Sequence, residues 1–191
     1  MTSTPPAWTG IKRPQRSDAR RNFDALLASA REAFGQKGPD ASLEDVARRA
    51  GVGIGTLYRN FPTREALIEA VYVAEVERVV SAADAVDGLE PWPALRTWLE
   101  AFLDSIGTKH ALIDALNRES AVLLDARRAL YAAGEPLLRR AQDAGEVRPD
   151  VVIDDILSML SGILGIALPD VAQRDRLLGI AFDGLRAGVS R

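Results

Sequence analysis

The chain has 191 residues, of which 47% are hydrophobic and 27% are charged. This balance is typical of a globular protein with an adequate core, and it excludes a disordered or fibrous chain. The sequence contains no cysteine, which excludes disulfides, thiolate metal sites and cysteine nucleophiles. No apolar run is long enough for a signal peptide or a bilayer span, so we expect a cytoplasmic protein without membrane contact.

The charge is divided unevenly along the chain. Residues 1–64 contain 11 Lys and Arg against 6 Asp and Glu, and residues 65–191 contain 13 against 21, which gives net charges of +5 and −8. A basic first third on an acidic remainder favours contact between the first part and a polyanion. A chance division of a mixed surface is the alternative, and the charge alone does not exclude it.

The first third reads as a flexible arm followed by three helices. Residues 1–16 lack periodicity and contain helix breakers, so we expect a flexible basic arm there. Apolar residues then recur at helical spacing from Ser17 to Lys37. Ser42 opens a second helix, with Asp45 placed to return the capping bond. A short third helix is expected from about Ile54, closed by a proline at position 62.

The remainder also reads as helices alone. A long helix is expected over about 63–83, followed by helices at 93–106, 111–116 and 119–144, the last kinked or split by Pro136. Two strongly apolar helices complete the chain after residues 153 and 170. No strand pattern competes anywhere. The sequence therefore predicts an all-α fold of about nine helices: an N-terminal three-helix helix-turn-helix domain and a C-terminal helical bundle.

Three residues in the first third have the spacing of a helix-turn-helix. Ala47, Gly51 and Leu57 stand at relative positions 1, 5 and 11. The first must be small where two helices cross, the second favours glycine because the turn needs a positive φ, and the third must be apolar to fill the angle between the helices. Short helix pairs in other bundles also produce this pattern, so its specificity is moderate.

The residues around this pattern are far more specific. Residues 42–67 read SLEDVARRAGVGIGTLYRNFPTREAL, and the helix ahead of them ends AFGQKG. This stretch closely resembles the DNA-binding segment of the TetR family of transcriptional regulators over roughly residues 20–70. The C-terminal part resembles TetR regulatory domains in its pattern of helices, and it is most similar to the SbtR-like branch.

The resemblance implies a division of labour and a set of partners. Residues 17–64 would bind DNA, and residues 65–191 would bind an effector and dimerise. The expected protein is a homodimeric repressor, released from a near-palindromic double-stranded DNA operator by a small-molecule effector. The alternative is a ligand-binding or interaction protein whose DNA-binding domain is vestigial.

The resemblance and the residue chemistry together give a set of candidate DNA-binding residues. Thr56 can meet a thymine methyl or a polar base edge, and Arg59 can meet a guanine or, as we favour, a phosphate. Gly53 stands where the family usually has a small hydroxyl residue and Asn60 where it has His or Tyr, which leaves the operator sequence open. The full set is Ser42, Arg48, Gly53, Ile54, Gly55, Thr56, Tyr58, Arg59, Asn60 and Arg64.

Several of these candidates have a plainer alternative. Tyr58 could be a core aromatic residue packed on the first helix, and Arg48 and Arg59 could belong to an ordinary solvated face. Ser42 caps its helix and also stands where a phosphate is favoured. Arg64 replaces a lysine that is typical of the family and should contact the DNA backbone. Basic residues of the arm and the first helix could enter the minor groove or remain disordered charge: Arg13, Arg16, Arg20 and Arg21.

The C-terminal half supplies candidates for an effector pocket and a dimer interface. The pocket set mixes aromatic and polar residues of the middle helices: Trp98, Phe102, Asn117, Arg118, Leu123, Arg127, Tyr131 and Met159. For any single one, core or surface placement is the stronger interpretation. The interface set lies on the last two helices: Ile156, Leu160, Ile163, Leu164, Leu178, Phe182 and Leu185. His110 is the only histidine and no catalytic motif is present, so we expect neither an enzyme nor a cofactor or metal.

Overall fold

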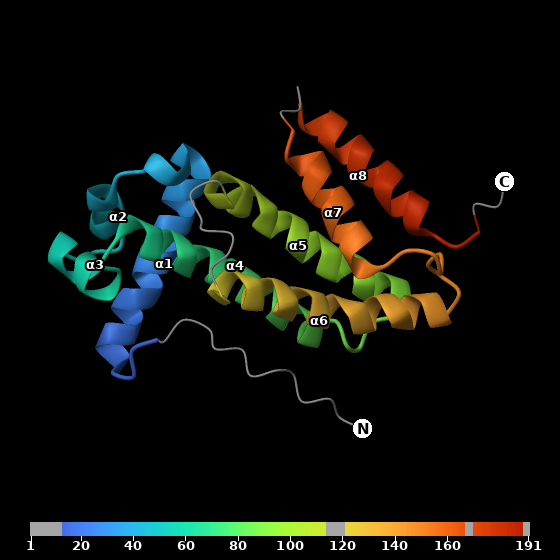
Figure 1. Ribbon diagram of the computed structural model, residues 1–191, viewed down its shortest axis with the longest axis horizontal. Coiled ribbons are helices and arrows are strands. Elements are labelled where there is room, and N and C mark those ends of the chain that lie inside the picture. Colours follow the sequence, from blue (N-terminus) through green and yellow to red (C-terminus); the bar gives the residue numbers. More distant parts are fainter. Residues whose placement is uncertain (1–12, 114–120, 167–169, 189–191) are drawn as a thin grey trace. The chain divides into compact units, whose positions relative to one another are not determined.

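A computed structural model describes residues 13–113, 121–166 and 170–188, with side chains described outside 106–113. Within these ranges the chain forms eight α-helices and a 3-10 helix, η1, and no strand (Figure 1). This confirms the all-α prediction. The helices are α1 (Ser17–Lys37), α2 (Leu43–Arg49), α3 (Ile54–Asn60), α4 (Arg64–Ala85), α5 (Pro91–Ile113), α6 (Ala121–Asp143), α7 (Ile153–Leu164) and α8 (Val171–Leu185), with η1 (Gly38–Asp40) after α1. No helix in the described ranges is both long enough and apolar enough to cross a membrane.

The described residues divide into two compact units. The first unit contains the residues up to Glu77 together with those of 107–127, and the second contains those of 78–106 and those from 128 onward. The first unit therefore extends beyond residue 64, where the sequence places the end of the DNA-binding domain. The reason is that the first half of α4 buries Leu67, Ile68 and Val71 in the same core as α1.

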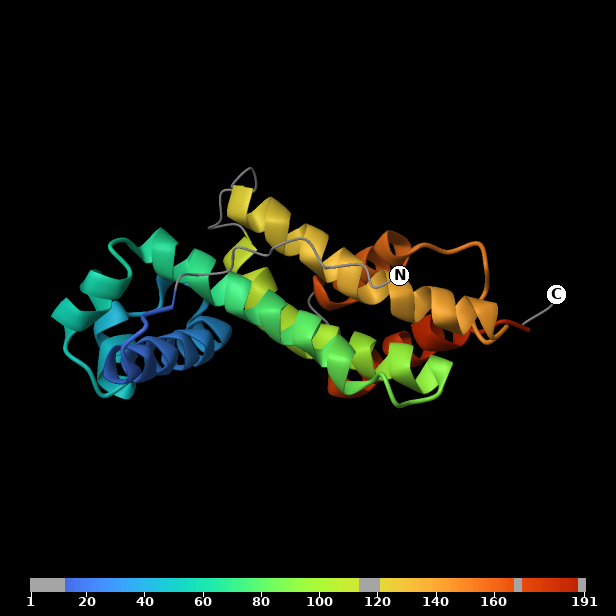
Figure 2. The ribbon, with the colours of Figure 1, turned by 90° about the horizontal axis from the view of Figure 1, so that it is seen from below.

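The first unit is built on the apolar face of α1. The short helices α2 and α3 lie beside α1 in both ribbon views (Figure 1 and Figure 2). The rings of Phe23 and Phe61 pack with their centroids 5.0 Å apart, which joins α1 to the residue that follows α3. The core of this unit contains Phe23, Leu26, Leu27, Ala30, Ala33, Phe34, Ala41, Leu43, Val46, Ala47, Leu57, Phe61, Leu67, Ile68, Ala70, Val71 and Leu123.

The second unit is packed around Trp98 of α5. Its ring is fully buried, and its Nε1 donates a hydrogen bond to the Val79 carbonyl of α4 at 2.9 Å. On α6, Gly134 lies so close to this ring that an added Cβ would stand 2.4 Å from it. A side chain at position 134 would therefore collide with the ring, which explains the glycine inside this helix.

Two details of the predicted helices differ in the structure. Pro136 does not split α6, which is one helix from Ala121 to Asp143, so of the two predicted outcomes only a kink stays a prediction. Buried Leu137 and Leu138 follow the proline and hold the helix against the core, which offsets the hydrogen bond that proline cannot make. The separate helix expected at 111–116 is not present as such, because α5 continues to Ile113; residues 114–120 lie outside the described ranges.

Candidate nucleic-acid interface

The turn between α2 and α3 has the geometry that its residue spacing predicts. Gly51 adopts a φ of +70°, in the region where side chains are strained. The Val52 N–H donates to the Ala47 carbonyl at 3.0 Å, which closes the turn. Ala47 and Leu57 are 2% and 0% exposed, so the small residue and the apolar residue both lie where the two helices meet. The predicted helix-turn-helix is therefore present in the fold.

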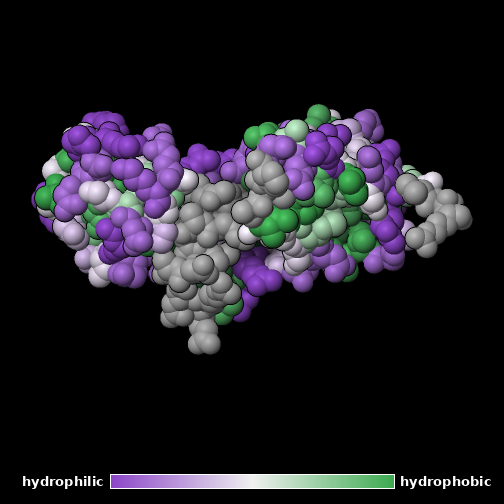
Figure 3. All heavy atoms as spheres, turned by 90° about the horizontal axis from the view of Figure 1, so that it is seen from above, coloured by the Kyte–Doolittle hydropathy of each residue, from purple (hydrophilic) through white to green (hydrophobic). Residues whose placement is uncertain are grey.

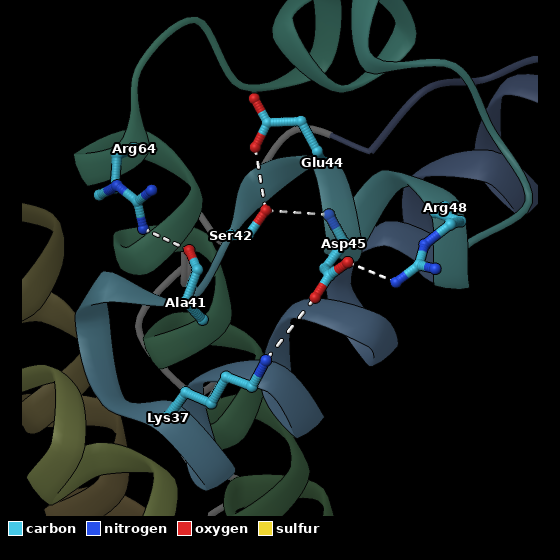
Figure 4. A network of polar contacts seen from close by, with 7 residues as sticks. All are labelled: Lys37, Ala41, Ser42, Glu44, Asp45, Arg48 and Arg64. Carbon is cyan, nitrogen blue, oxygen red and sulfur yellow. Dashed lines mark hydrogen bonds and ion pairs between the residues drawn. The ribbon is translucent and has the colours of Figure 1, made fainter.

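The start of α2 is capped on one side only. The Ser42 Oγ accepts a hydrogen bond from the Asp45 N–H at 3.2 Å, as predicted, but the expected return bond from the Asp45 side chain is not made. The Asp45 carboxylate instead pairs with Arg48 and lies 3.6 Å from the Lys37 Nζ (Figure 4). The Ser42 hydroxyl donates to Glu44 Oε2 at 2.9 Å. Competing cations on α1 and α2 thus take the carboxylate that the capping box would use.

These contacts lower the pKa of both acidic side chains. Hydrogen bonding to Arg48 and its positive charge lower the pKa of Asp45. Hydrogen bonds from its own backbone N–H and from Ser42 lower the pKa of Glu44. Arg48 is consequently neutralised by its neighbour, which weakens its attraction for a phosphate.

Arg64 links the start of α4 to the segment ahead of α2. Its Nη1 donates to the carbonyls of Pro39 and Ala41, at 2.7 Å each; Figure 4 shows the bond to Ala41. The sequence predicts a contact between this residue and the DNA backbone, and that role stays a prediction. The structure adds an internal role, because the two bonds fix the loop that carries Ser42.

The outer face of α3 is open to solvent. Ile54 and Tyr58 are 37% and 46% exposed, and Gly53, Gly55 and Arg59 are exposed as well. The core placement considered for Tyr58 is therefore wrong; the neighbouring Leu57 fills that role instead. Because Ile54 and Tyr58 stand four residues apart, they lie one turn from each other on the same helix face.

Two polar side chains of α3 fold back onto Thr56 or its neighbour. Arg59 donates from Nη2 to the Thr56 Oγ at 2.9 Å and from Nε to the Gly55 carbonyl at 3.2 Å. Asn60 donates from Nδ2 to the Thr56 carbonyl at 2.8 Å. Thr56 and Asn60 are half-buried as a result. The last turn of α3 thus holds its own side chains in one arrangement.

Basic residues of the arm and of α1 divide into paired and unpaired ones. Arg13 contacts Glu77 of α4 at 2.5 Å and Asp24 of α1 at 3.7 Å, and Arg21 pairs with Asp18. Arg16 and Arg20 are exposed and have no carboxylate partner within the part of the chain that the structure describes. If any of this segment reaches the minor groove, these two are therefore the better placed.

The predicted pocket residues do not gather in one core. Trp98 and Phe102 are buried in the second unit, whereas Leu123 belongs to the core of the first. The Tyr131 hydroxyl donates to Asp154, and Met159 is 38% exposed. Arg127 is exposed on α6. Asn117, Arg118 and the His110 side chain lie outside the described residues. The effector pocket stays a prediction.

Four of the seven predicted interface residues are buried in the core of the chain itself. Ile156, Leu160, Phe182 and Leu185 are at most 7% exposed. The Phe182 ring meets the Trp92 ring edge-on at 6.3 Å, and the Arg96 guanidinium lies over it at 5.4 Å. The other three residues are half-buried: Ile163, Leu164 and Leu178.

The interface prediction missed several exposed apolar residues in and around the last two helices. Met159, Ile166, Val171 and Ile180 are 38%, 58%, 62% and 68% exposed. Met159 and half-buried Ile163 stand one turn apart on α7, and with Ile180 of α8 we name them the exposed apolar face of α7 and α8. Ile166 lies beyond the end of α7, and Val171 stands on the opposite side of α8 from Ile180. Apolar residues also colour the surface of the second unit in Figure 3. The only spacing signal for them is on α7, where Met159 and Ile163 stand four residues apart on one side of the helix.

The geometry of α2, the turn and α3 defines a helix-turn-helix unit, a class of structure that binds DNA by placing its second helix in the major groove. Comparison with known proteins agrees with that class. The family model described as "Bacterial regulatory proteins, tetR family" matches residues 26–71. The model described as "Transcriptional regulator SbtR-like, C-terminal domain" matches residues 90–187, about half of the chain.

The chain belongs to the TetR family of transcriptional regulators, with an SbtR-like C-terminal domain. It is similar to the crystal structure of the TetR transcriptional regulator SCO0520 from Streptomyces coelicolor, with a TM-score of 0.72 and 43% identity, covering 87% of this chain and 99% of that one. UidR, an HTH-type transcriptional regulator of Escherichia coli, is 24% identical over 90% of this chain and 92% of its own. KstR, an HTH-type transcriptional repressor of Rhodococcus jostii, is 30% identical over 54% of this chain and 48% of its own. The resemblance read from residues 42–67 is confirmed.

Proposed function

We propose that the protein is a homodimeric repressor that binds a near-palindromic DNA operator through α3 and releases it when a small molecule binds. The open face of α3, presented by a correctly formed turn, is the observation that carries the DNA-binding part of this proposal. The name of KstR as a repressor supports the sign of regulation.

The size and charge of the α3 region suit a major groove. A helix of seven residues is about 10 Å long, and the groove is about 12 Å wide, so the whole outer face can meet base edges. Arg59 supplies a cation without a carboxylate partner among the described residues. Tyr58 adds an exposed ring and hydroxyl that can reach the sugar-phosphate backbone.

The exposed apolar face of α7 and α8 supports the dimer. Single exposed apolar residues are ordinary, but Met159 and Ile163 stand one turn apart on α7, and Ile180 is 68% exposed on α8. A second copy that packs the same two helices against these would bury the face in a four-helix bundle. A two-fold dimer then presents two α3 helices to half-sites about 34–36 Å apart.

Release by an effector requires that effector binding in the second unit changes the DNA affinity of the first unit. Helix α4 offers a continuous path, because its residues up to Glu77 belong to one unit and those from Arg78 to the other. A small molecule that prefers dimers with wrongly spaced α3 helices weakens operator binding by its differential affinity, typically about 1–3 kcal/mol.

The proposal is tested by selecting bound duplexes from a random DNA library with the purified protein. We expect enrichment of one near-palindromic sequence. The Arg59→Ala variant should bind this sequence about 5- to 150-fold more weakly, whereas Arg139→Ala should bind it as the wild type does. Arg139 is a matched control because it is an exposed arginine of α6 in the second unit. Absence of enrichment, together with absence of binding at low salt, would instead indicate a ligand-binding or interaction protein with a vestigial DNA domain.

A further inference from the structure

We propose that Thr56 is a positioning residue, which orients the guanidinium of Arg59 so that its outer edge reads a guanine in the operator. The inference rests on the proposed function and names the residue pair that gives it base specificity. It reverses the preference for a phosphate that the sequence alone suggests for Arg59.

The orientation follows from two hydrogen bonds on one side of the guanidinium. Nε and Nη2 form one edge of this planar group, and they donate to the Gly55 carbonyl and the Thr56 Oγ. Both acceptors belong to the preceding turn of the same helix. The plane of the guanidinium is therefore fixed relative to α3 before any DNA is bound.

The outer edge of the same group remains available. Nη1 and the second hydrogen of Nη2 have no partner within the described residues. No carboxylate neutralises Arg59 there, in contrast to Arg48, whose charge is taken by Asp45. Arg59 thus offers two parallel donors and a full positive charge at the exposed face of α3.

Two parallel donors in a fixed plane suit guanine specifically, whereas binding a phosphate does not require them. Guanine presents the acceptors O6 and N7 side by side in the major groove, and a bidentate arginine is its commonest specific partner. A phosphate can be bound by a cation in many orientations and needs no fixed plane. Holding the plane in advance reduces the conformational entropy lost on binding.

Thr56 is the residue that favours guanine over phosphate as the partner of Arg59. Its hydroxyl is the only side-chain group that Arg59 contacts within the described residues. Its carbonyl also holds Asn60, so Thr56 organises the whole last turn of α3. The competing interpretation is that Thr56 touches the DNA directly through its methyl or hydroxyl group.

Two substitutions separate these interpretations. Thr56→Val keeps the shape and a methyl group but removes the hydroxyl that Arg59 uses, and Thr56→Ser keeps the hydroxyl but removes the methyl. Each is combined with Arg59→Ala in a double-mutant cycle. The probes are the operator selected by the wild type and duplexes in which each of its G·C pairs is replaced in turn by A·T. Thermal unfolding checks that every variant folds.

We expect Arg59→Ala to lose about 5- to 150-fold discrimination at one G·C pair of each half-site. Thr56→Val should lose most of the same discrimination at the same pair, and Thr56→Ser should retain it. Thr56→Val should have no further effect once Arg59 is absent. Because Thr56→Val keeps all charges, its salt dependence should equal that of the wild type.

Three results would overturn the inference while leaving the proposed function intact: unchanged discrimination in Thr56→Val, an effect of Thr56→Val that persists without Arg59, or uniform weakening by Arg59→Ala across all duplexes. Failure of the wild type to select any sequence would refute the proposed function itself, and this inference with it.

Discussion

At the scale of single residues, charge pairing decides which basic side chains remain available to a polyanion. Arg48 and Arg59 are both exposed near the helix-turn-helix, yet Asp45 neutralises only the first. Within the net charge of +5 over residues 1–64, Arg48 and Asp45 therefore cancel each other, whereas Arg59 contributes a full positive charge at the exposed face of α3.

Removing the Asp45 carboxylate should leave the positive charge of Arg48 available to a phosphate. The Asp45→Asn variant is expected to bind DNA about 2- to 5-fold more tightly at low salt, with the gain shrinking as salt screens it. Fluorescence anisotropy over a salt series measures this. Substitution is needed because Arg48 lowers the pKa of Asp45, so a mild fall in pH does not neutralise it. Asp150→Asn is the matched control, since Asp150 pairs with Arg148 in the second unit; an equal gain there would contradict the explanation.

Backbone conformation at the turn gives an independent test. Gly51→Ala places a side chain at a φ of +70° and should lower the free energy of unfolding by about 1–2 kcal/mol. Gly55→Ala makes the same chemical change inside α3, where nothing lies within 4 Å of the added Cβ. It should raise the free energy of unfolding by up to about 1 kcal/mol. Denaturant titration of both variants checks the opposite signs, and equal effects would refute the role assigned to Gly51.

At the scale of elements, the second unit depends on close contact between α5 and α6. Gly134→Ala drives a Cβ to within 2.4 Å of the buried Trp98 ring. The ring is held by its bond to Val79, so the strain cannot be relieved cheaply. We expect a loss of about 1–3 kcal/mol in the free energy of unfolding. Gly88→Ala, in open space, should change it little; similar stability of the two variants would show that the contact relaxes.

The elements also show what the sequence can and cannot predict. The helix-turn-helix was predictable because Ala47, Gly51 and Leu57 act through local geometry at fixed spacing. The return bond from the Asp45 side chain is not made because Lys37 of α1 and Arg48 compete for the carboxylate, a competition that the spacing of Ser42 and Asp45 does not reveal. On the last two helices the apolar pattern is too broad to separate inner from outer residues. For this reason Leu160 and Phe182 were predicted at the interface although they lie in the core, and exposed Ile180 was missed.

At the scale of the whole molecule, the proposed function requires two copies of the chain. Ile180 is 68% exposed on α8 and is expected to be buried against a partner. Ile180→Glu should therefore shift the protein from dimer to monomer in sedimentation velocity experiments, because burying an unpaired carboxylate is costly. Leu89→Glu serves as the control, since Leu89 is 42% exposed between α4 and α5 and lies on neither of the last two helices. An unchanged dimer in Ile180→Glu would place the interface elsewhere.

The most direct test of the central claim compares two affinities of the wild type: for the selected operator and for a scrambled duplex of the same composition, across a salt series. We expect the operator to be bound at least about 1,000-fold more tightly than the scrambled duplex near physiological salt. We also expect both affinities to fall steeply as salt rises. Equal affinity for the two duplexes would contradict sequence-specific binding through α3.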